Sequence, residues 1–185
     1  DAGLGLRVHG NQLGPGPGAR LAAELGAASV DHVNYLSDDD VDLLADTWGD
    51  WDAAAASGAP GTVATCLPAC DLSTRQPLAP GRRLLDAGVE IALASNCNPG
   101  TSYTSSMNFN VGTAVLQMHL SLAEAVRAAT LGAAVALRVQ DSVGSIEVGK
   151  RADLHLLNAP AAIHLAYRPG MPLTHAVWRR GQRQV

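Results

Sequence analysis

The sequence is poor in aromatic side chains, in charged side chains and in long apolar runs. Only 4% of its 185 residues are Phe, Trp or Tyr, and 16% are charged. Its longest apolar runs, such as residues 91–94 and 133–137, are far shorter than the roughly 20 residues that a membrane-crossing helix needs. Lys and Arg number 13 against 17 Asp and Glu, which gives no basic surplus for binding nucleic acid or an anionic membrane. We therefore expect neither a nucleic-acid nor a membrane partner.

Cysteine is also scarce. The three cysteines are Cys66, Cys70 and Cys97, an odd number without a CxxC spacing, which argues against a disulfide scaffold and against a structural zinc knot. We interpret them as small buried apolar residues. No leader pattern precedes the first strand-like segment, so the expected location is a reducing cytoplasm. With 47% hydrophobic residues the chain can still bury a core.

The first two thirds of the chain repeat one unit, a short apolar strand followed by a polar turn and an alanine-rich helix. The predicted strands are uninterrupted apolar runs, as is typical of strands covered on both faces. Alternation of strands and helices at this spacing predicts a parallel sheet with right-handed crossovers, and the fold class is α/β. The predicted strands are 4–9, 29–33, 62–67 and 89–95, and the predicted helices are 18–25, 38–45 and 81–87.

The later segments carry different signals. Residues 68–80 contain three prolines and are predicted to form a long loop, which in a compact domain is often functional. One helix is expected from about residue 111 and a second from Ser121, which has the capping-box spacing to Glu124. Three short extended pieces then predict a small β domain. We place the site in residues 1–142 and the small β domain in 143–185, with its strands at 145–148, 152–157 and 175–179.

Candidate reactive side chains follow the predicted strands, where the active sites of parallel α/β folds lie. His9 ends the first strand, His32 lies at the end of the second, and the polar run 96–101 follows the fourth. Imidazole is a good ligand for zinc or ferrous iron, and a hydroxide on such a metal is a nucleophile at neutral pH. The pattern indicates metal-assisted hydrolysis. The alternative for His9 is a hydrogen-bonded structural histidine.

These motifs resemble the imidazolonepropionases of the amidohydrolase superfamily. The resemblance rests on the run 6–12, on Asp31-His32 and on the run 92–101, while residues 144–153 are similar to the segment by which many amidohydrolases re-enter a small β domain. It implies the later half of a TIM-like (β/α)8 metal-dependent hydrolase barrel, plus C-terminal strands of a small composite β domain. It also implies hydrolysis of the cyclic amide 4-imidazolone-5-propanoate to N-formimidoyl-L-glutamate, in histidine degradation, with zinc or iron.

The same resemblance implies a role for individual residues. His9 resembles the metal ligand that ends the fifth barrel strand, and Gln12 occupies a substrate-contacting position on the following loop. His32 stands where the family keeps a histidine suited to polarising the ring carbonyl or moving a proton. The substrate-binding loop is represented by Asn98, Gly100 and Thr101.

Asn96 departs from the superfamily pattern. The resemblance implies an aspartate there, which ligates the metal and takes the proton of the attacking water, and an amide cannot accept that proton. Either His32 takes over as base, or the metal is held more loosely, or catalysis is poor. Two alternatives stay open, an amidohydrolase for a different cyclic amide or guanidine, and a non-catalytic barrel that binds a small metabolite or a partner chain.

The resemblance also bears on assembly. The family's His-x-His pair on the first barrel strand is absent, and a complete eight-stranded barrel needs about 250 residues, so we expect the sequence to be incomplete. Half a barrel exposes sheet edges and an unpacked interior, and we expect it to aggregate or to pair with itself. Relatives in the superfamily commonly form dimers, so a homodimer is a candidate assembly.

Overall fold

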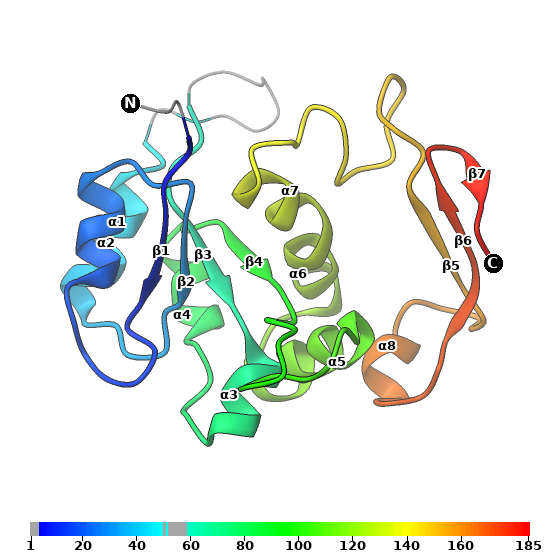
Figure 1. Cartoon of the computed structure of the whole chain (residues 1–185), viewed down its shortest axis with the longest axis horizontal. Helices are drawn as coiled ribbons and strands as arrows, with labels where there is room; N and C mark the ends of the chain where they lie inside the picture. Colours follow the sequence, from blue (N-terminus) through cyan, green and yellow to red (C-terminus); the bar gives the residue numbers. More distant parts are fainter. Residues whose placement is uncertain (1–3, 50, 52–58) are drawn as a thin grey trace.

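The computed structural model describes residues 4–49, 51 and 59–185. It contains a four-stranded parallel sheet with the strand order β1-β2-β3-β4 and a separate three-stranded antiparallel sheet (Figure 1). The predicted α/β class is confirmed. All four predicted strands of the parallel sheet form and are shorter than predicted, and β1 ends one residue later than predicted: β1 is Arg7–Gly10, β2 Ser29–His32, β3 Val63–Cys66 and β4 Ile91–Leu93.

Three predicted helices connect these strands with bounds within one residue of the prediction. They are α1 (Gly18–Glu24), α2 (Asp38–Asp46) and α4 (Gly81–Asp86). The start of α2 is fixed by a capping box in which the Ser37 side chain accepts a hydrogen bond from the Asp40 N–H and the Asp40 carboxylate accepts one from Ser37. Val30, Leu44 and Leu84 are fully buried between this sheet and its helices, so apolar burial holds the layers together.

The predicted long loop over 68–80 is wrong in its first half, which forms α3 (Pro68–Thr74). Pro68 occupies the first turn of this helix, where its missing N–H leaves no intrahelical hydrogen bond unmade. Arg75 then adopts a left-handed conformation with φ 58° and ends the helix. Proline therefore marked a helix start here rather than a loop.

The helix expected from residue 111 begins earlier, as α5 (Met107–Gln117), because the Ser106 hydroxyl caps it by accepting from the Phe109 N–H. The predicted capping box between Ser121 and Glu124 is confirmed. It starts a continuous helical segment that contains one π-helical turn. The segment comprises α6 (Leu122–Arg127), the turn η1 (Ala128–Gly132) and α7 (Ala133–Ala136).

Gly132 lets this helical segment approach the sheet closely. A Cβ atom at Gly132 would collide with the Ile91 carbonyl oxygen of β4. We therefore expect Gly132→Ala to lower the free energy of unfolding by about 2 kcal/mol, the usual cost of overpacking a buried contact. Urea denaturation of the chain measures this. Gly5→Ala is the matched control, because nothing lies within 4 Å of a Cβ there, and equal midpoints for the two variants would contradict the expectation.

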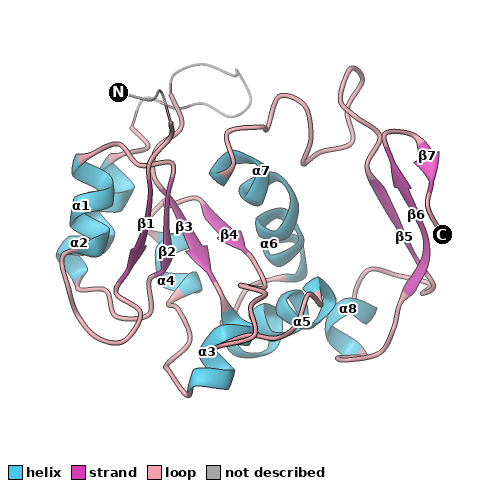
Figure 2. Cartoon of the chain, viewed as in Figure 1, coloured by secondary structure: helices cyan, strands magenta, loops and turns pink. Residues whose placement is uncertain are grey.

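The C-terminal part forms the antiparallel sheet from β5 (Leu154–Leu157), β6 (Thr174–Arg179) and β7 (Gln182–Arg183). A short helix, α8 (His164–Tyr167), packs against α5 between the two sheets (Figure 2). The strand predicted at 145–148 is wrong. That segment is made of turns and irregular backbone, and Ile146 and Val148 are fully or almost fully exposed. No helix among the described residues is long and apolar enough to span a bilayer.

Candidate functional site

The structure brings two predicted site residues, His9 and His32, into contact at the carboxyl ends of neighbouring strands. His9 of β1 pairs in register with Asp31 of β2, and Gly10 pairs with His32. The Nε2 atom of His32 lies 3.1 Å from the Nδ1 atom of His9. The two ring centroids are 5.2 Å apart. His9 is exposed, whereas His32 is only 2% exposed.

The backbone at the end of β2 is unusual. His32 and the following Val33 have φ values of 85° and 51°, a region that side-chain-bearing residues rarely adopt and a β-branched residue still less. Such strain persists where the surrounding structure fixes it, and it collects at functional sites. Here it accompanies the burial of an imidazole against a second one.

Burial decides the charge of His32. Removal from water lowers the pKa of the His32 imidazole below its usual value, and the proximity of His9 lowers it further. The negative charge of Asp31 raises this pKa but does not outweigh the other two effects. His32 is therefore neutral at pH 7. Its Nδ1 atom is buried and has no hydrogen-bond partner among the described residues. A neutral imidazole with a free nitrogen can act as a ligand or accept a proton.

The loop after β1 is fastened by Asn11, which lies between the predicted residues His9 and Gln12. The buried Asn11 side chain donates to the carbonyl oxygens of Gly16 and Tyr35 and accepts from the Ala19 N–H. The Nε2 atom of Gln12 lies 3.8 Å from the sulfur atom of Cys70 in α3. Gln12 therefore sits on a loop of fixed shape.

Asn98 organises the loop that follows β4. Its side-chain oxygen accepts from the N–H groups of Gly100 and Thr101, at 2.9 and 2.8 Å. Its amide nitrogen donates to the Asn96 carbonyl oxygen at 2.7 Å and to the Thr101 hydroxyl at 3.0 Å. Both hydrogens of the Asn98 amide are thus used inside the loop. A direct contact of Asn98 with substrate stays a prediction, and in this structure Asn98 shapes the loop.

No hydrogen bond among the described residues links the Asn96 side chain to the histidine pair. Asn96 follows β4, whereas His9 ends β1, and these are the two outer strands of the sheet. Asn96 is half-buried, with φ 51°. A metal ion shared by His9 and Asn96 stays a prediction.

The donor set suits a metal such as zinc only in part. His9 and His32 provide two adjacent imidazoles, one of them with an orphaned buried nitrogen. Catalytic zinc sites use three protein ligands and an open position. Within residues 4–49, 51 and 59–185, no three side chains of His, Cys, Asp or Glu are close enough to hold one ion. The chain thus supplies the right chemistry for some of the ligands of such a site.

Sequence reasoning missed a buried carboxyl group near this site. Asp71 of α3 is 1% exposed, and its burial raises the pKa of the carboxyl to about 6, although hydrogen bonds from Asn34 and from the Ala79 N–H lower it. Asn34 follows His32 by two residues and donates to the Pro77 carbonyl oxygen at 2.7 Å. One oxygen each of Asp71 and Asn34 has no partner among the described residues. The only signal was an acidic residue five positions after the end of a buried strand.

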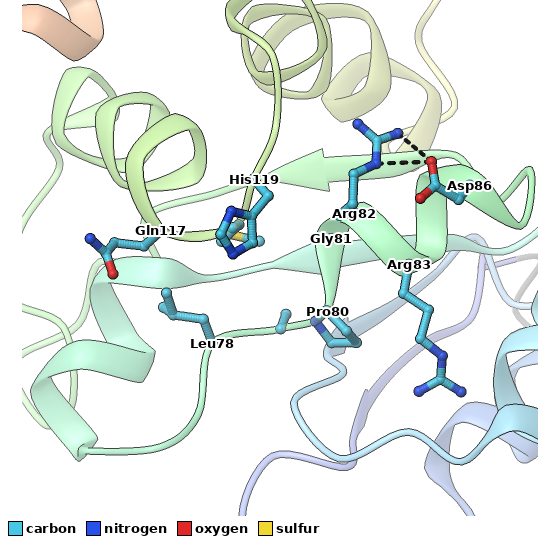
Figure 3. A pocket seen from close by; sticks show the side chains of 10 residues that line it. Leu78, Pro80, Gly81, Arg82, Arg83, Asp86, Gln117 and His119 are labelled. Carbon is cyan, nitrogen blue, oxygen red and sulfur yellow. Dashed lines mark hydrogen bonds and ion pairs between the residues drawn. The ribbon is translucent and has the colours of Figure 1, made fainter.

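Two surface hollows lie away from the histidine pair. The first, about 480 Å³, is lined by polar residues that include Arg82, Arg83 and His119 and by apolar residues (Figure 3). Arg82 is paired with Asp86 and Glu124, and Arg83 with Asp38, so neither cation is free for a ligand. The second, about 470 Å³, lies between the start of α5 and the antiparallel sheet. Neither hollow contains a predicted site residue.

Comparison with known proteins places the chain in a family. Residues 29–179 match the family model described as the amidohydrolase family. The chain belongs to this family. Among curated members, the imidazolonepropionase of Micrococcus luteus is 78% identical over 184 residues, covering 100% of this chain and 46% of the relative. That of Arthrobacter sp. is 73% identical over 191 residues, covering 99% and 47%. The resemblance is confirmed, and the chain spans about half the length of these family members.

Solved structures of the same fold include zinc enzymes. An adenosine deaminase from Xanthomonas campestris with bound zinc superimposes with a TM-score of 0.79 at 25% identity, covering 98% of this chain and 45% of that one. An atrazine chlorohydrolase from Arthrobacter aurescens TC1 complexed with zinc gives 0.74 at 22% identity, covering 98% and 44%. The predicted hydrolase-type α/β fold of this family member is confirmed.

Proposed function

We propose that this chain forms the later half of an imidazolonepropionase that opens the ring of 4-imidazolone-5-propanoate. In the reaction, water adds to the ring carbonyl carbon, the bond from that carbon to the ring nitrogen breaks, and the nitrogen takes up a proton. The product is N-formimidoyl-L-glutamate. The observation that carries the proposal is the buried, neutral His32 in contact with His9 at adjacent strand ends, in a chain 78% identical to a named imidazolonepropionase.

A divalent metal, zinc or iron, would be held by His9 and by further ligands from outside this chain. The side-chain carbonyl oxygen of Asn96 would be a neutral and weaker ligand. Zinc in two structural neighbours supports this class of cofactor. When bound, such a metal supplies Lewis-acid activation of water. Asn96 cannot accept a proton, so the residue that moves the proton is His32. Its lowered pKa keeps it in the neutral form that accepts one.

The remaining predicted residues would bind the substrate. Gln12 does not titrate and orients the ring. Gly100 and Thr101 would bind the imidazolone edge or the propanoate, on a loop whose shape Asn98 fixes. The partner in this proposal is a small molecule rather than nucleic acid or a membrane. The division at residues 142 and 143, a cytoplasmic location and a homodimer remain predictions.

A second candidate is a barrel that binds a small metabolite without catalysis. It is favoured by Asn96 in place of an acidic ligand and by the lack of a three-ligand group among the described residues. The third candidate, an amidohydrolase for another cyclic amide or guanidine, shares the site residues and differs in its substrate.

A chimera separates these candidates. In the Micrococcus luteus relative, the segment matched over 184 residues is replaced by this chain. We expect turnover of 4-imidazolone-5-propanoate within about tenfold of the parent enzyme, because a shared site changes the barrier by less than the 1.4 kcal/mol that corresponds to tenfold. Turnover of another cyclic amide or guanidine alone would favour the third candidate. A folded chimera without turnover on any of these rings would overturn the proposal in favour of the second.

A further inference from the structure

Helix α3 bridges two loops of the candidate site that belong to the outer strands of the parallel sheet. The Cys70 sulfur lies 3.8 Å from the Gln12 amide on the loop after β1. The Ser73 hydroxyl, one turn further along α3, contacts the Thr101 carbonyl oxygen on the loop after β4, and it also lies 3.0 and 3.1 Å from the Ala69 and Cys70 carbonyl oxygens of its own helix. The loops after β1 and β4 are otherwise separated by β2 and β3. The segment in which the sequence suggested a functional loop is therefore a helix that joins two site loops.

The helix is itself fixed in place, so it can hold a loop. The Ala69 N–H, in its first turn, donates to the side-chain oxygen of Asn110 at 3.2 Å. Asn110 is fully buried in α5, and its amide donates to the Ser106 carbonyl oxygen at 2.9 Å. Helices α3 and α5 lie side by side (Figure 1). This doubly bonded buried amide attaches the start of α3 to the body of the fold.

The loop after β4, in contrast, has few ties to its surroundings. Its hydrogen bonds are mostly internal, made by Asn98 with Asn96, Gly100 and Thr101 and by the Ser102 hydroxyl with the Ser95 carbonyl oxygen. Over residues 95–102, the contact of Ser73 with Thr101 is the one hydrogen bond to another element in the described part of the chain. The internal bonds set the shape of the loop, and the Ser73 bond sets its position.

We propose that Ser73 is a positioning residue that holds the loop 98–101 at a fixed distance from Gln12. The position of the loop depends on this chain alone. The effect of that position on substrate affinity rests on the proposed function, in which the same loop binds a cyclic amide that carries a carboxylate. Loss of the Ser73 hydroxyl would leave the loop free to shift and would let its internal hydrogen bonds open more often. Substrate affinity would then fall, while the histidine pair, on β1 and β2, would remain in place.

Hydrogen exchange tests the positioning step. Mass spectrometry on this chain, and in parallel on the chimera, follows the amides of residues 96–104 in Ser73→Ala, Ser73→Thr and Thr74→Ala. We expect about fivefold faster exchange in Ser73→Ala, the change that one hydrogen bond makes, and recovery in Ser73→Thr. Thr74→Ala is the matched control, because the Thr74 hydroxyl bonds only carbonyl oxygens of its own helix, those of Cys70 and Asp71. Equal exchange in Ser73→Ala and in the unmodified chain would overturn the inference.

Steady-state kinetics of the chimera test the consequence. We expect Ser73→Ala to raise KM about fivefold with little change in kcat, and Ser73→Thr to restore KM. Faster exchange together with a raised KM supports both the positioning and the proposed function. Faster exchange with an unchanged KM supports the positioning and shows that the loop does not bind the substrate. A fall in kcat alone would contradict the assignment, because positioning of a binding loop acts on affinity.

Discussion

Replacing His32 by Gln in the chimera is expected to lower kcat by about 10²-fold to 10⁴-fold, the usual contribution of a proton-transferring side chain. Glutamine keeps a polar group beside His9, at the position where the His32 Nε2 atom now lies 3.1 Å from the His9 Nδ1 atom. It cannot take up a proton. The variant therefore separates proton transfer from simple filling of the buried space. Steady-state turnover of 4-imidazolone-5-propanoate measures the effect.

His119→Gln is the matched control. His119 is exposed and lines a hollow away from the histidine pair, so its replacement leaves kcat unchanged. Thermal unfolding of both variants shows whether the His32→Gln protein is folded. If a folded His32→Gln variant kept the kcat of the parent chimera, His32 would not move the proton and the assignment would be wrong.

Asp71→Asn is expected to stabilise the chain at neutral pH. The pKa of the Asp71 carboxyl is about 6 in the folded protein against an ordinary value of 3.8. At a pH between these two pKa values, the Asp71 carboxyl is protonated in the folded state and ionised in the unfolded state. Stability falls as the pH rises from about 4 to about 6 and stays lower above that. With 1.36 kcal/mol for each pKa unit, ionisation costs the fold about 3 kcal/mol at pH 7.5.

The asparagine variant lacks this cost, and its amide can donate to a neighbouring acceptor, for example the unpartnered side-chain oxygen of Asn34. Urea unfolding at pH 4 and at pH 7.5 measures the difference. We expect equal stability at pH 4 and a gain of up to about 3 kcal/mol for Asp71→Asn at pH 7.5. Asp141→Asn, at an exposed position, is the control and leaves the pH dependence unchanged. The same difference between Asp71→Asn and the parent at both pH values would contradict the account.

The elements that could be predicted from the sequence are those with local signals. Strands β3 and β4 are short runs of mostly apolar residues, and Ser37 and Ser121 begin helices through capping boxes. Strand β7 and helix α8 are only two and four residues long. They form because β6 and α5 are already present to pair or pack with them. Such contacts depend on residues distant in sequence and leave no local pattern.

Residues 145–148 show the opposite error. Their alternating Ile146 and Val148 suggested a strand, but both side chains are exposed, and the segment forms a turn in which Lys150 bonds Ser145. A strand needs a neighbour with which to pair, and β5 pairs with β6 instead. A periodic pattern alone therefore did not decide the structure here.

Part of the candidate site could be predicted because chemistry and strand ends coincide. His9 and His32 end two neighbouring strands, and parallel pairing brings them together. Asn96 follows the other outer strand, so the sequence could not determine its distance from His9. Asp71 and Ser73 lie in a helix that the sequence did not reveal. Their importance depends on burial and on a contact with a loop roughly thirty residues away, which only the folded structure supplies.

We propose that His9 belongs to a metal site on the shared rim of β1 and β2. Metal content by mass spectrometry of the chimera and of its His9→Ala variant, after dialysis against buffer without metal, tests it most directly. We predict about one zinc or iron ion per chain in the chimera and a loss of most of it in His9→Ala, since catalytic sites rely on only three protein ligands. His155→Ala, at an exposed histidine of β5, keeps the metal. One ion per chain retained by His9→Ala would contradict the claim.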